Sequence, residues 1–278
     1  MPRMSDASIS PVSPISILRL TVRYRTLILR LARREVEARY RGSLLGIFWS
    51  VLTPLLMVAA YSFVFSVIFQ PRWQVPPGAN ANFVLLLYSG LLVFNLFAEC
   101  VARAPGLVME NISYVKKVVF PLEILPLVAM VSALVNFSIG FCVMMVIYTI
   151  MLGLPPLTIF LLPVVVLPVI LFTLGFTWML AALGVFLRDL RHVVAVLVTV
   201  LLFLGPIFYP VAAVPEKIRF VLYLNPLTPA LEMSKDVLFW GLLPDFWFLA
   251  ATILASWALA WLGYLCFARL RPGFADVV

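Results

Sequence analysis

The chain has 278 residues, of which 64% are hydrophobic and only 12% carry a formal charge, and its mean hydropathy is +1.11. Soluble domains contain about 25% charged residues, so this composition excludes an ordinary soluble protein and is typical of an integral membrane protein. The three cysteines, Cys100, Cys142 and Cys266, lie in or beside apolar segments, and we expect them to be small buried side chains rather than disulfides or metal ligands.

The first 43 residues are basic and precede the first long apolar run. On a helical wheel, the apolar residues from Ile17 to Leu31 share one side and most of the arginines share the other. Such a basic amphipathic helix is expected to lie in the membrane interface, with its cationic side toward anionic headgroups. Arg25, Glu35 and Arg39 depart from this pattern, and a solvated cytoplasmic helix is the alternative. We expect no cleaved signal peptide, so the first span would act as the targeting signal.

Charge-free runs predict six membrane-spanning helices. No Asp, Glu, Lys or Arg occurs from Gly42 to Pro71, and the 64 residues from Ile124 to Leu187 also carry no formal charge. A bilayer core of about 30 Å takes roughly 20 helical residues, so the longer run must turn back on itself. Its strongest break is GLPP at residues 153–156. The expected spans are 44–69, 83–105, 120–152, 157–187, 193–209 and 246–268.

The segment 205–245, between the fifth and sixth spans, is apolar but is interrupted by prolines and charged residues every few positions. Neither VPEKIRFVLY nor PALEMSKDVLFWG is able to cross a bilayer. We expect two short helices, joined at Asn225-Pro226, that dip into the outer leaflet as a re-entrant hairpin. Backbone of this kind is stable only where protein or a water-filled cavity surrounds it, which indicates a conduit.

The basic residues predict the orientation of the spans. Sixteen of the 20 Lys and Arg residues fall on the side of the membrane that holds both termini, so both termini are expected to be cytoplasmic. The expected fold is an all-α integral membrane protein with six transmembrane helices, an N-terminal amphipathic interface helix and the re-entrant hairpin. Residues 1–43 would form the cytoplasmic N-terminus with the interface helix, and residues 44–278 the six-helix transmembrane domain.

Patterns for enzyme chemistry are absent from the sequence. There is no GxxxxGK[ST] loop for ATP, no HExxH, and no Cys/His pair at ligand spacing. The single histidine, His192, stands in RDLRH and is expected to be structural. We therefore predict no catalytic residue, no metal site and no cofactor bound by this chain.

Charged residues are also scarce inside the expected spans. Ion-coupled transporters place ionisable groups deep in their helices, whereas here only Glu99 and Arg103, near the cytoplasmic end of the second span, break the pattern. Because they are four residues apart, we expect them to pair with each other as a structural clasp. A secondary transporter is disfavoured, so a partner must supply the energy.

Four stretches of the sequence resemble the membrane subunit of type-2 ABC polysaccharide exporters, the group of Wzm-like O-antigen, capsule and teichoic-acid permeases. They occur in the family's order and are spread over most of the chain. They are RYRGSLLGIFWSVLTPLL (39–56), FLRDLRH (186–192), GPIFYP (205–210) and NPLTP (225–229).

The resemblance implies a homodimer in the bacterial inner membrane that works with two copies of a cytoplasmic ATPase, which would bind ATP and Mg. The implied substrate is a glycan linked to undecaprenyl diphosphate, with contacts to membrane lipids and none to nucleic acid. RYRGSLLGIFW is most similar to the O-antigen branch. Capsule or teichoic-acid export, an ABC drug or lipid exporter of the same fold, and a non-transporting anchor remain alternatives.

The connection 105–117 resembles the family's coupling helix, which docks into the ATPase, and an ordinary loop is the alternative. Polar and aromatic groups on a short exposed helix suit a docking surface. The residues expected to dock are Glu110, Asn111, Tyr114, Lys116 and Lys117.

Two further groups of residues, one of arginines and one of aromatic residues, are expected to contact the substrate. Arginine gives bidentate contacts to phosphate oxygens, so the arginines directly before the first span are expected to bind the diphosphate headgroup, with simple positive-inside anchoring as the alternative. These arginines are Arg33, Arg34, Arg39 and Arg41. Aromatic rings can bind sugar faces weakly enough to release them, although most aromatic residues in a span face lipid or another helix. The aromatic residues expected to line a conduit are Tyr61, Phe65, Phe203, Phe208 and Tyr209.

Overall fold

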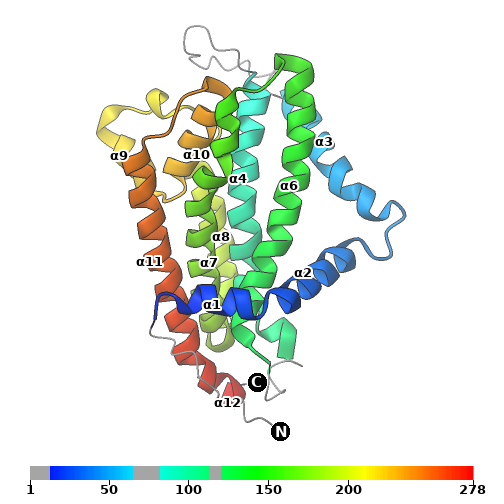
Figure 1. Cartoon of the computed structure of the whole chain (residues 1–278), viewed down its shortest axis with the longest axis vertical. Helices are drawn as coiled ribbons and strands as arrows, with labels where there is room; N and C mark the ends of the chain where they lie inside the picture. The colour runs from blue at the N-terminus through cyan, green and yellow to red at the C-terminus, as the bar shows by residue number, and fades with distance from the viewer. Residues whose placement is uncertain (1–12, 65–81, 113–119, 278) are drawn as a thin grey trace.

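The computed structural model describes residues 13–64, 82–112 and 120–277, and the regular elements in these ranges are helical. Four of the described helices, together with short 3-10 extensions, are long and apolar enough to cross a membrane. They run side by side along the long axis of the molecule (Figure 1). These helices are α4 (Phe83–Arg103), α6 (Leu125–Leu152), α7 (Leu162–Phe186) and α11 (Phe246–Leu270).

The expected all-α membrane architecture is confirmed at this level. The four long helices correspond to the expected second, third, fourth and sixth spans. The expected first and fifth spans correspond to shorter apolar helices, α3 (Trp49–Ser62) and α8 (Leu190–Leu204), of 14 and 15 residues. Residues 65–69 of the expected first span lie outside the described residues, and the count of six spans stays a prediction.

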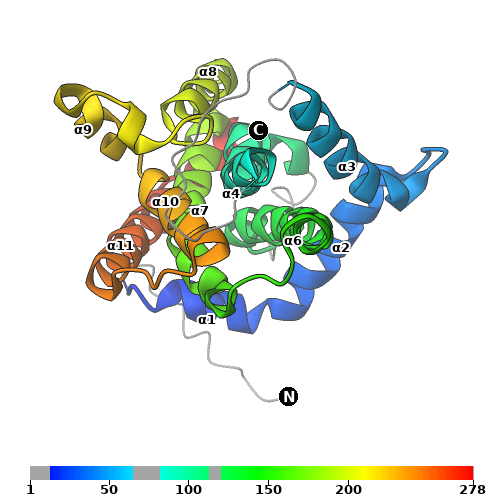
Figure 2. The same ribbon diagram turned by 90° about the horizontal axis from the view of Figure 1, so that it is seen from above.

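Helix α4 lies at the centre of the bundle, where it packs against α3, α6, α7, α8 and α10, as the view along the long axis shows (Figure 2). In the most apolar 18-residue stretch of this helix, 83% of the residues are buried, compared with 22% in the corresponding stretch of α11. The sequence agrees with this position, because charged residues in a membrane helix, here Glu99 and Arg103, face other protein or a cavity rather than lipid. Asn82 caps its first turn by accepting a hydrogen bond from the Val84 N–H at 2.9 Å.

Helices α7 and α11 cross with their backbones in direct contact. A Cβ atom added at Gly263 would lie 2.0 Å from the carbonyl oxygen of Gly175, and one added at Gly175 would lie 2.7 Å from the carbonyl oxygen of Leu259. Small residues allow membrane helices to approach this closely, since apolar side chains gain little there by leaving lipid. Next to the crossing, the Trp178 and Tyr264 rings meet edge to face, with centroids 5.6 Å apart.

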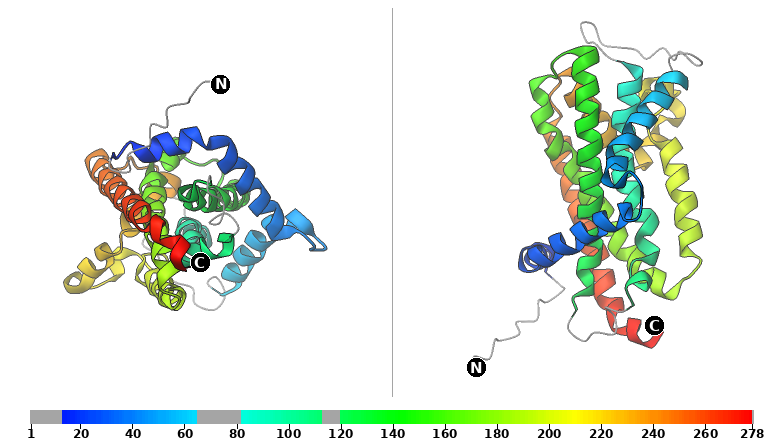
Figure 3. Two further views of the ribbon diagram at one scale, coloured as in Figure 1. Left: turned by 90° about the horizontal axis from the view of Figure 1, so that it is seen from below. Right: turned by 90° about the vertical axis from the view of Figure 1, so that its right-hand side faces the viewer.

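The expected N-terminal amphipathic helix is divided at Tyr24 into α1 (Ser16–Arg23) and α2 (Arg25–Tyr40). Both helices lie across the side of the bundle rather than along it (Figure 3). On the expected apolar side, Ile17, Leu20 and Ile28 are at most 4% exposed, and α2 packs against α6. The apolar side is therefore covered by protein, and the place of these helices relative to a membrane surface stays a prediction.

Two short helices, α9 (Glu216–Leu224) and α10 (Thr228–Lys235), lie at the end of the bundle opposite to α12 (Phe274–Val277) (Figure 1). The buried side chain of Asn225 fixes the turn between them. It donates to the carbonyl of Leu201 at 3.1 Å and accepts from the N–H of Leu227 at 3.0 Å. The two expected short helices are thus present, and their depth in a membrane stays a prediction.

The close crossing of α7 and α11 gives a prediction for stability. Gly263→Ala should lower the thermal unfolding temperature of the purified protein in detergent, because its Cβ meets backbone and the helices must separate, at a cost of about 1–3 kcal/mol. Gly90→Ala in α4 is the matched control, since its Cβ would lie 3.4 Å from the Ile207 side chain, an ordinary contact. Equal unfolding temperatures for the two variants would contradict the crossing.

Candidate functional site

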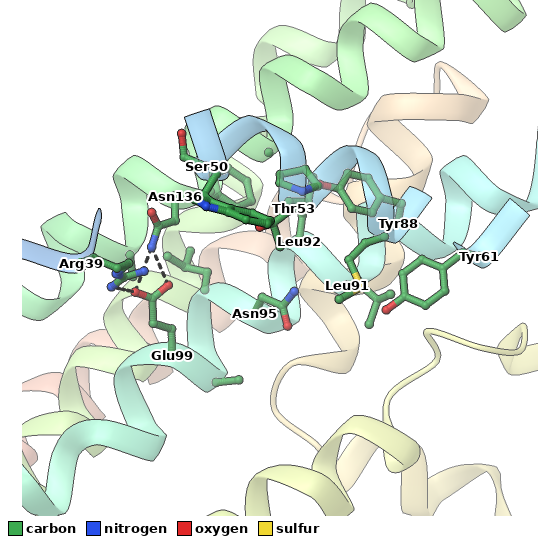
Figure 4. Close-up of a pocket in the computed structure, with 18 residues that line it drawn as sticks. Arg39, Ser50, Thr53, Tyr61, Tyr88, Leu91, Leu92, Asn95, Glu99 and Asn136 are labelled. Carbon is green, nitrogen blue, oxygen red and sulfur yellow. Dashed lines mark hydrogen bonds and ion pairs between the residues drawn. The ribbon is translucent and has the colours of Figure 1, made fainter. Parts of the chain in front are cut away.

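A groove of about 650 Å³ opens between α3, α4 and α6 (Figure 4). Apolar and aromatic side chains form much of its wall, and polar side chains are distributed along its length. The apolar and aromatic residues include Trp49, Pro54, Met57, Leu91, Leu92 and Phe137, and the polar ones are Arg39, Ser50, Thr53, Tyr61, Tyr88, Asn95, Glu99 and Asn136.

The sequence places these polar side chains on four different helices, α2, α3, α4 and α6. Asn95 is the exposed residue in a stretch of α4, Val84 to Phe97, whose other members are all buried, so this amide faces the groove. Ser50, Thr53 and Tyr61 come from one side of α3. Hydroxyl and amide groups are able to donate and accept hydrogen bonds without carrying charge, so the middle of the groove is polar and neutral.

Charged groups gather at one end of the groove. Glu99 of α4 accepts a hydrogen bond from Nη2 of Arg39, at the end of α2. Nδ2 of Asn136, from α6, lies 3.0 Å from each carboxylate oxygen of Glu99. A single carboxylate therefore joins α2, α4 and α6 at the rim of the groove, as the dashed lines in Figure 4 show.

The expected pairing of Glu99 with Arg103 is wrong. Arg103 pairs instead with Glu35 of α2, while Glu99 pairs with Arg39. Neighbours on another helix displace the local i, i+4 partner because α2 brings an acid and a base against α4 at the same spacing. This also explains why Glu35 and Arg39 depart from the amphipathic pattern, since they face α4 rather than solvent or lipid.

The four arginines expected to bind a diphosphate headgroup do not line a common cavity among the described residues. Arg33 points outward and pairs with Glu37, whose hydrogen bond raises the pKa of the Arg33 guanidinium. Arg34 lies beside Glu35 and Arg103 in a small pocket of about 260 Å³. Arg41 is exposed just after α2. Arg39 is the member that reaches the groove.

The described part of the expected docking segment is rigidly fixed to the bundle. Glu110 and Asn111 form a 3-10 turn after α4, and Glu110 lies 4.0 Å from the guanidinium of Arg191 at the start of α8. Pro105, which precedes this turn, packs against α7, where a Cβ added at Gly184 would lie 2.2 Å from the Pro105 carbonyl oxygen. The start of this connection therefore packs directly against the backbone of α7. The other three expected docking residues, Tyr114, Lys116 and Lys117, lie outside the described residues.

The expected conduit residues separate into two places. Tyr61 lines the groove, together with Pro54 and Met57 of the same helix. Phe203 and Phe208 stack at the far end of α8, with ring centroids 5.8 Å apart, and the Tyr209 hydroxyl donates to the carbonyl of Phe203 at 2.8 Å. These three residues are not part of the groove wall. Phe65 lies outside the described residues.

Sequence reasoning missed Asn95 and Asn136. The spans were predicted from runs without formal charge. These two amides carry no charge, so they did not stand out, although they lie inside otherwise apolar helices. Their polarity at such positions was the available signal, because a polar group in a membrane helix needs a partner or a polar cavity. No cluster of His, Cys, Asp or Glu able to hold a metal ion occurs in the described ranges.

Comparison with known proteins places the chain in a family. The family model described as ABC-2 type transporter matches residues 26–239. The chain is 32% identical over 266 residues to the O-antigen export system permease protein RfbA of Myxococcus xanthus, which covers 95% of this chain and all of that protein. Two proteins of the same name from Klebsiella pneumoniae are 25% and 26% identical over 254 residues, with 91% of this chain and 95% of each relative covered.

The family match covers more than half of the chain, and the similarity to the Myxococcus protein extends from end to end. The structure agrees, because its long apolar helices suit a multi-pass membrane protein. The chain therefore belongs to the ABC-2 type transporter family, as a membrane permease subunit.

Proposed function

We propose that this chain is the permease subunit of an ATP-driven exporter that moves an O-antigen-type polysaccharide, linked to undecaprenyl diphosphate, across the cytoplasmic membrane. The observation that carries the proposal is the end-to-end similarity, at 32% identity, to a protein named as an O-antigen export permease. The names of the relatives favour O-antigen over capsule or teichoic acid, and over a drug or lipid exporter. Similarity to permeases over the whole chain favours transport over a passive anchor.

The proposal includes six membrane spans with both termini in the cytoplasm. Helices α3 and α8 would be the first and fifth spans, although they are only about 21–23 Å long at 1.5 Å per residue. Short spans are accommodated by local thinning of the bilayer or by association with other protein. The exposed apolar residues Ile218, Phe220 and Tyr223 of α9 support a hairpin that enters the outer leaflet.

Energy would come from a cytoplasmic ATPase, with two copies serving a homodimer of this chain, and ATP and Mg would be bound by the ATPase alone. The connection after α4 would dock on it through Glu110, Asn111, Tyr114, Lys116 and Lys117. Its packing on α7 at Gly184 and its contact with Arg191 of α8 support this role, because a rigid link is needed to carry a domain movement into the membrane.

The groove would form part of the conduit. Its neutral amides and hydroxyls, interspersed with Trp49, Tyr61 and Tyr88, suit a polyhydroxylated chain that must bind weakly enough to move on. The aromatic cluster of Phe203, Phe208 and Tyr209 would contribute at the outer end of α8. At the rim, the guanidinium of Arg39 would meet the diphosphate, with Arg33, Arg34 and Arg41 drawing the anion toward it.

Loss of the chain tests the transport function. In a bacterium that encodes it, deletion should remove O-antigen from the cell surface while the lipid-linked glycan accumulates inside the cell, and re-expression should reverse both effects. The measurement is immunoblotting of surface and total glycan. Unchanged surface glycan in the deletion strain would contradict the proposal.

The docking segment gives a second prediction. Glu110→Ala combined with Tyr114→Ala should reduce copurification of the ATPase severalfold, since an interface loses an acidic and an aromatic contact. Arg191→Gln is the matched control, because it removes the contact with Glu110 but leaves Glu110 in place. Copurification unchanged in the double variant, with normal membrane insertion, would place the docking surface elsewhere.

Access to the groove gives a third prediction. In a chain whose native cysteines are replaced by alanine, Tyr61→Cys and Phe208→Cys should react with a water-soluble thiol reagent during ATP-driven transport, and the reaction should slow export. Val58→Cys is the control on the same helix as Tyr61, because Val58 is 7% exposed. If Val58→Cys reacts as fast as Tyr61→Cys, the side of α3 assigned to the conduit is wrong.

A further inference from the structure

The rim of the groove holds an ion pair at the place where the proposed headgroup would bind. Arg39, the arginine of the N-terminal set that reaches the groove, is already bound to Glu99. We propose that Arg39, Glu99 and Asn136 form a switchable site for a phosphate or diphosphate group, in which Glu99 occupies the position of the anion until the ligand arrives. This inference rests on the proposed function and adds the regulation of its headgroup site.

The geometry around Glu99 is that of an anion in a binding site. Two donors from two different helices converge on it, the guanidinium of Arg39 and the amide of Asn136, the latter at 3.0 Å from both carboxylate oxygens. Phosphate and carboxylate oxygens accept the same charge-assisted hydrogen bonds from arginine, and phosphate also suits a bidentate fork. Arg39 donates its hydrogen bond to Glu99 through a single nitrogen, Nη2, rather than through a bidentate fork.

The site is accessible and large enough for a headgroup. The side chains of Arg39 and Glu99 are 32% and 23% exposed, so an anion that enters the groove is able to compete for the guanidinium. The adjoining groove of about 650 Å³ lies in the range of roughly 300–1,000 Å³ that holds small-molecule ligands.

A neighbouring cation, Arg103, lowers the free-energy cost of replacing Glu99 by a phosphate at Arg39. Arg103 stands four residues after Glu99 on α4, and Glu35 stands four residues before Arg39 on α2, so each pair is also positioned to interact within its own helix. All four side chains line one cavity of about 380 Å³. When a phosphate takes Arg39, Glu99 keeps Asn136, and Arg103 remains as the cation that Glu99 and Glu35 share.

The exchange has a mechanical consequence. The Arg39–Glu99 and Arg103–Glu35 pairs hold α2 against α4, and α2 leads directly into α3, which forms one wall of the groove. Binding of the headgroup would break the Arg39–Glu99 link and leave the Arg103–Glu35 pair as the remaining one of these two links. The substrate anion itself would then loosen one wall of the groove.

The test measures binding of farnesyl diphosphate to the full-length chain in lipid nanodiscs, by isothermal titration calorimetry. Glu99→Gln should bind it about threefold to fivefold more tightly than the wild type, the range that a partly exposed ion pair contributes. Asn136→Asp should bind more weakly, because a second carboxylate then repels the anion. Glu216→Gln removes one negative charge from α9, at the far end of the bundle (Figure 1), and should leave the affinity unchanged.

Unfolding temperatures of all variants show whether they are folded. If the wild type binds farnesyl diphosphate more tightly than farnesol but Glu99→Gln binds no more tightly than the wild type, the inference is overturned and the proposed headgroup site stands. If the wild type binds farnesyl diphosphate no more tightly than farnesol, the inference and the proposed headgroup site both fail. If inorganic diphosphate binds as tightly as farnesyl diphosphate, the anion site stands, and its ligand is a soluble anion rather than a lipid headgroup.

Discussion

Charged side chains that stand against apolar helices need partners, and at one end of this bundle those partners hold the structure together. A carboxylate left unpaired in such surroundings is costly, and removal of one member of a buried pair is strongly destabilising. Glu99 and Glu35 meet arginines across the contact between α2 and α4. Glu123, which is 7% exposed, meets Arg271 beyond the end of α11. The N-terminal helices and the C-terminal end are therefore fixed to the spans by ion pairs as well as by packing.

The groove depends on this arrangement. Helix α2 is held on α4 and α6 by packing and ion pairs, and the chain then enters α3, which is tilted relative to α4 (Figure 1). The space between them is lined by amides and hydroxyls, and its charged end is the same ion pair that holds α2. A single set of contacts thus determines the position of the N-terminal helix, the opening of the groove and the availability of Arg39. The connection that we expect to meet the ATPase follows α4 and packs on α7 at Gly184.

The sequence predicted those features that depend on composition along a single segment. Long apolar runs predicted the all-α membrane fold and the four long helices, because length and hydrophobicity alone decide which segments are able to cross a bilayer. The sequence did not predict which charged residues pair. Glu99 and Arg103 have the spacing of a local pair, and only tertiary packing brings Arg39 and Glu35 to them. Tyr61, which was expected to line a conduit, lies in the groove wall, and its role in a conduit stays a prediction. The arginines of residues 33–41 were expected to act together but point in different directions. Helical periodicity locates a side chain on its own helix, but not the helix that it meets.

Ion pairs between α2 and α4 hold the N-terminal helix on the transmembrane bundle. A double-mutant cycle on Glu35 and Arg103 tests this most directly, with Glu35→Gln, Arg103→Gln and the combined variant compared by thermal unfolding in detergent. Because each single change leaves a charged partner behind, both should lower the unfolding temperature, and the combined variant should lose less than the sum of the two. Strictly additive losses would show that Glu35 and Arg103 do not interact, and would contradict the account.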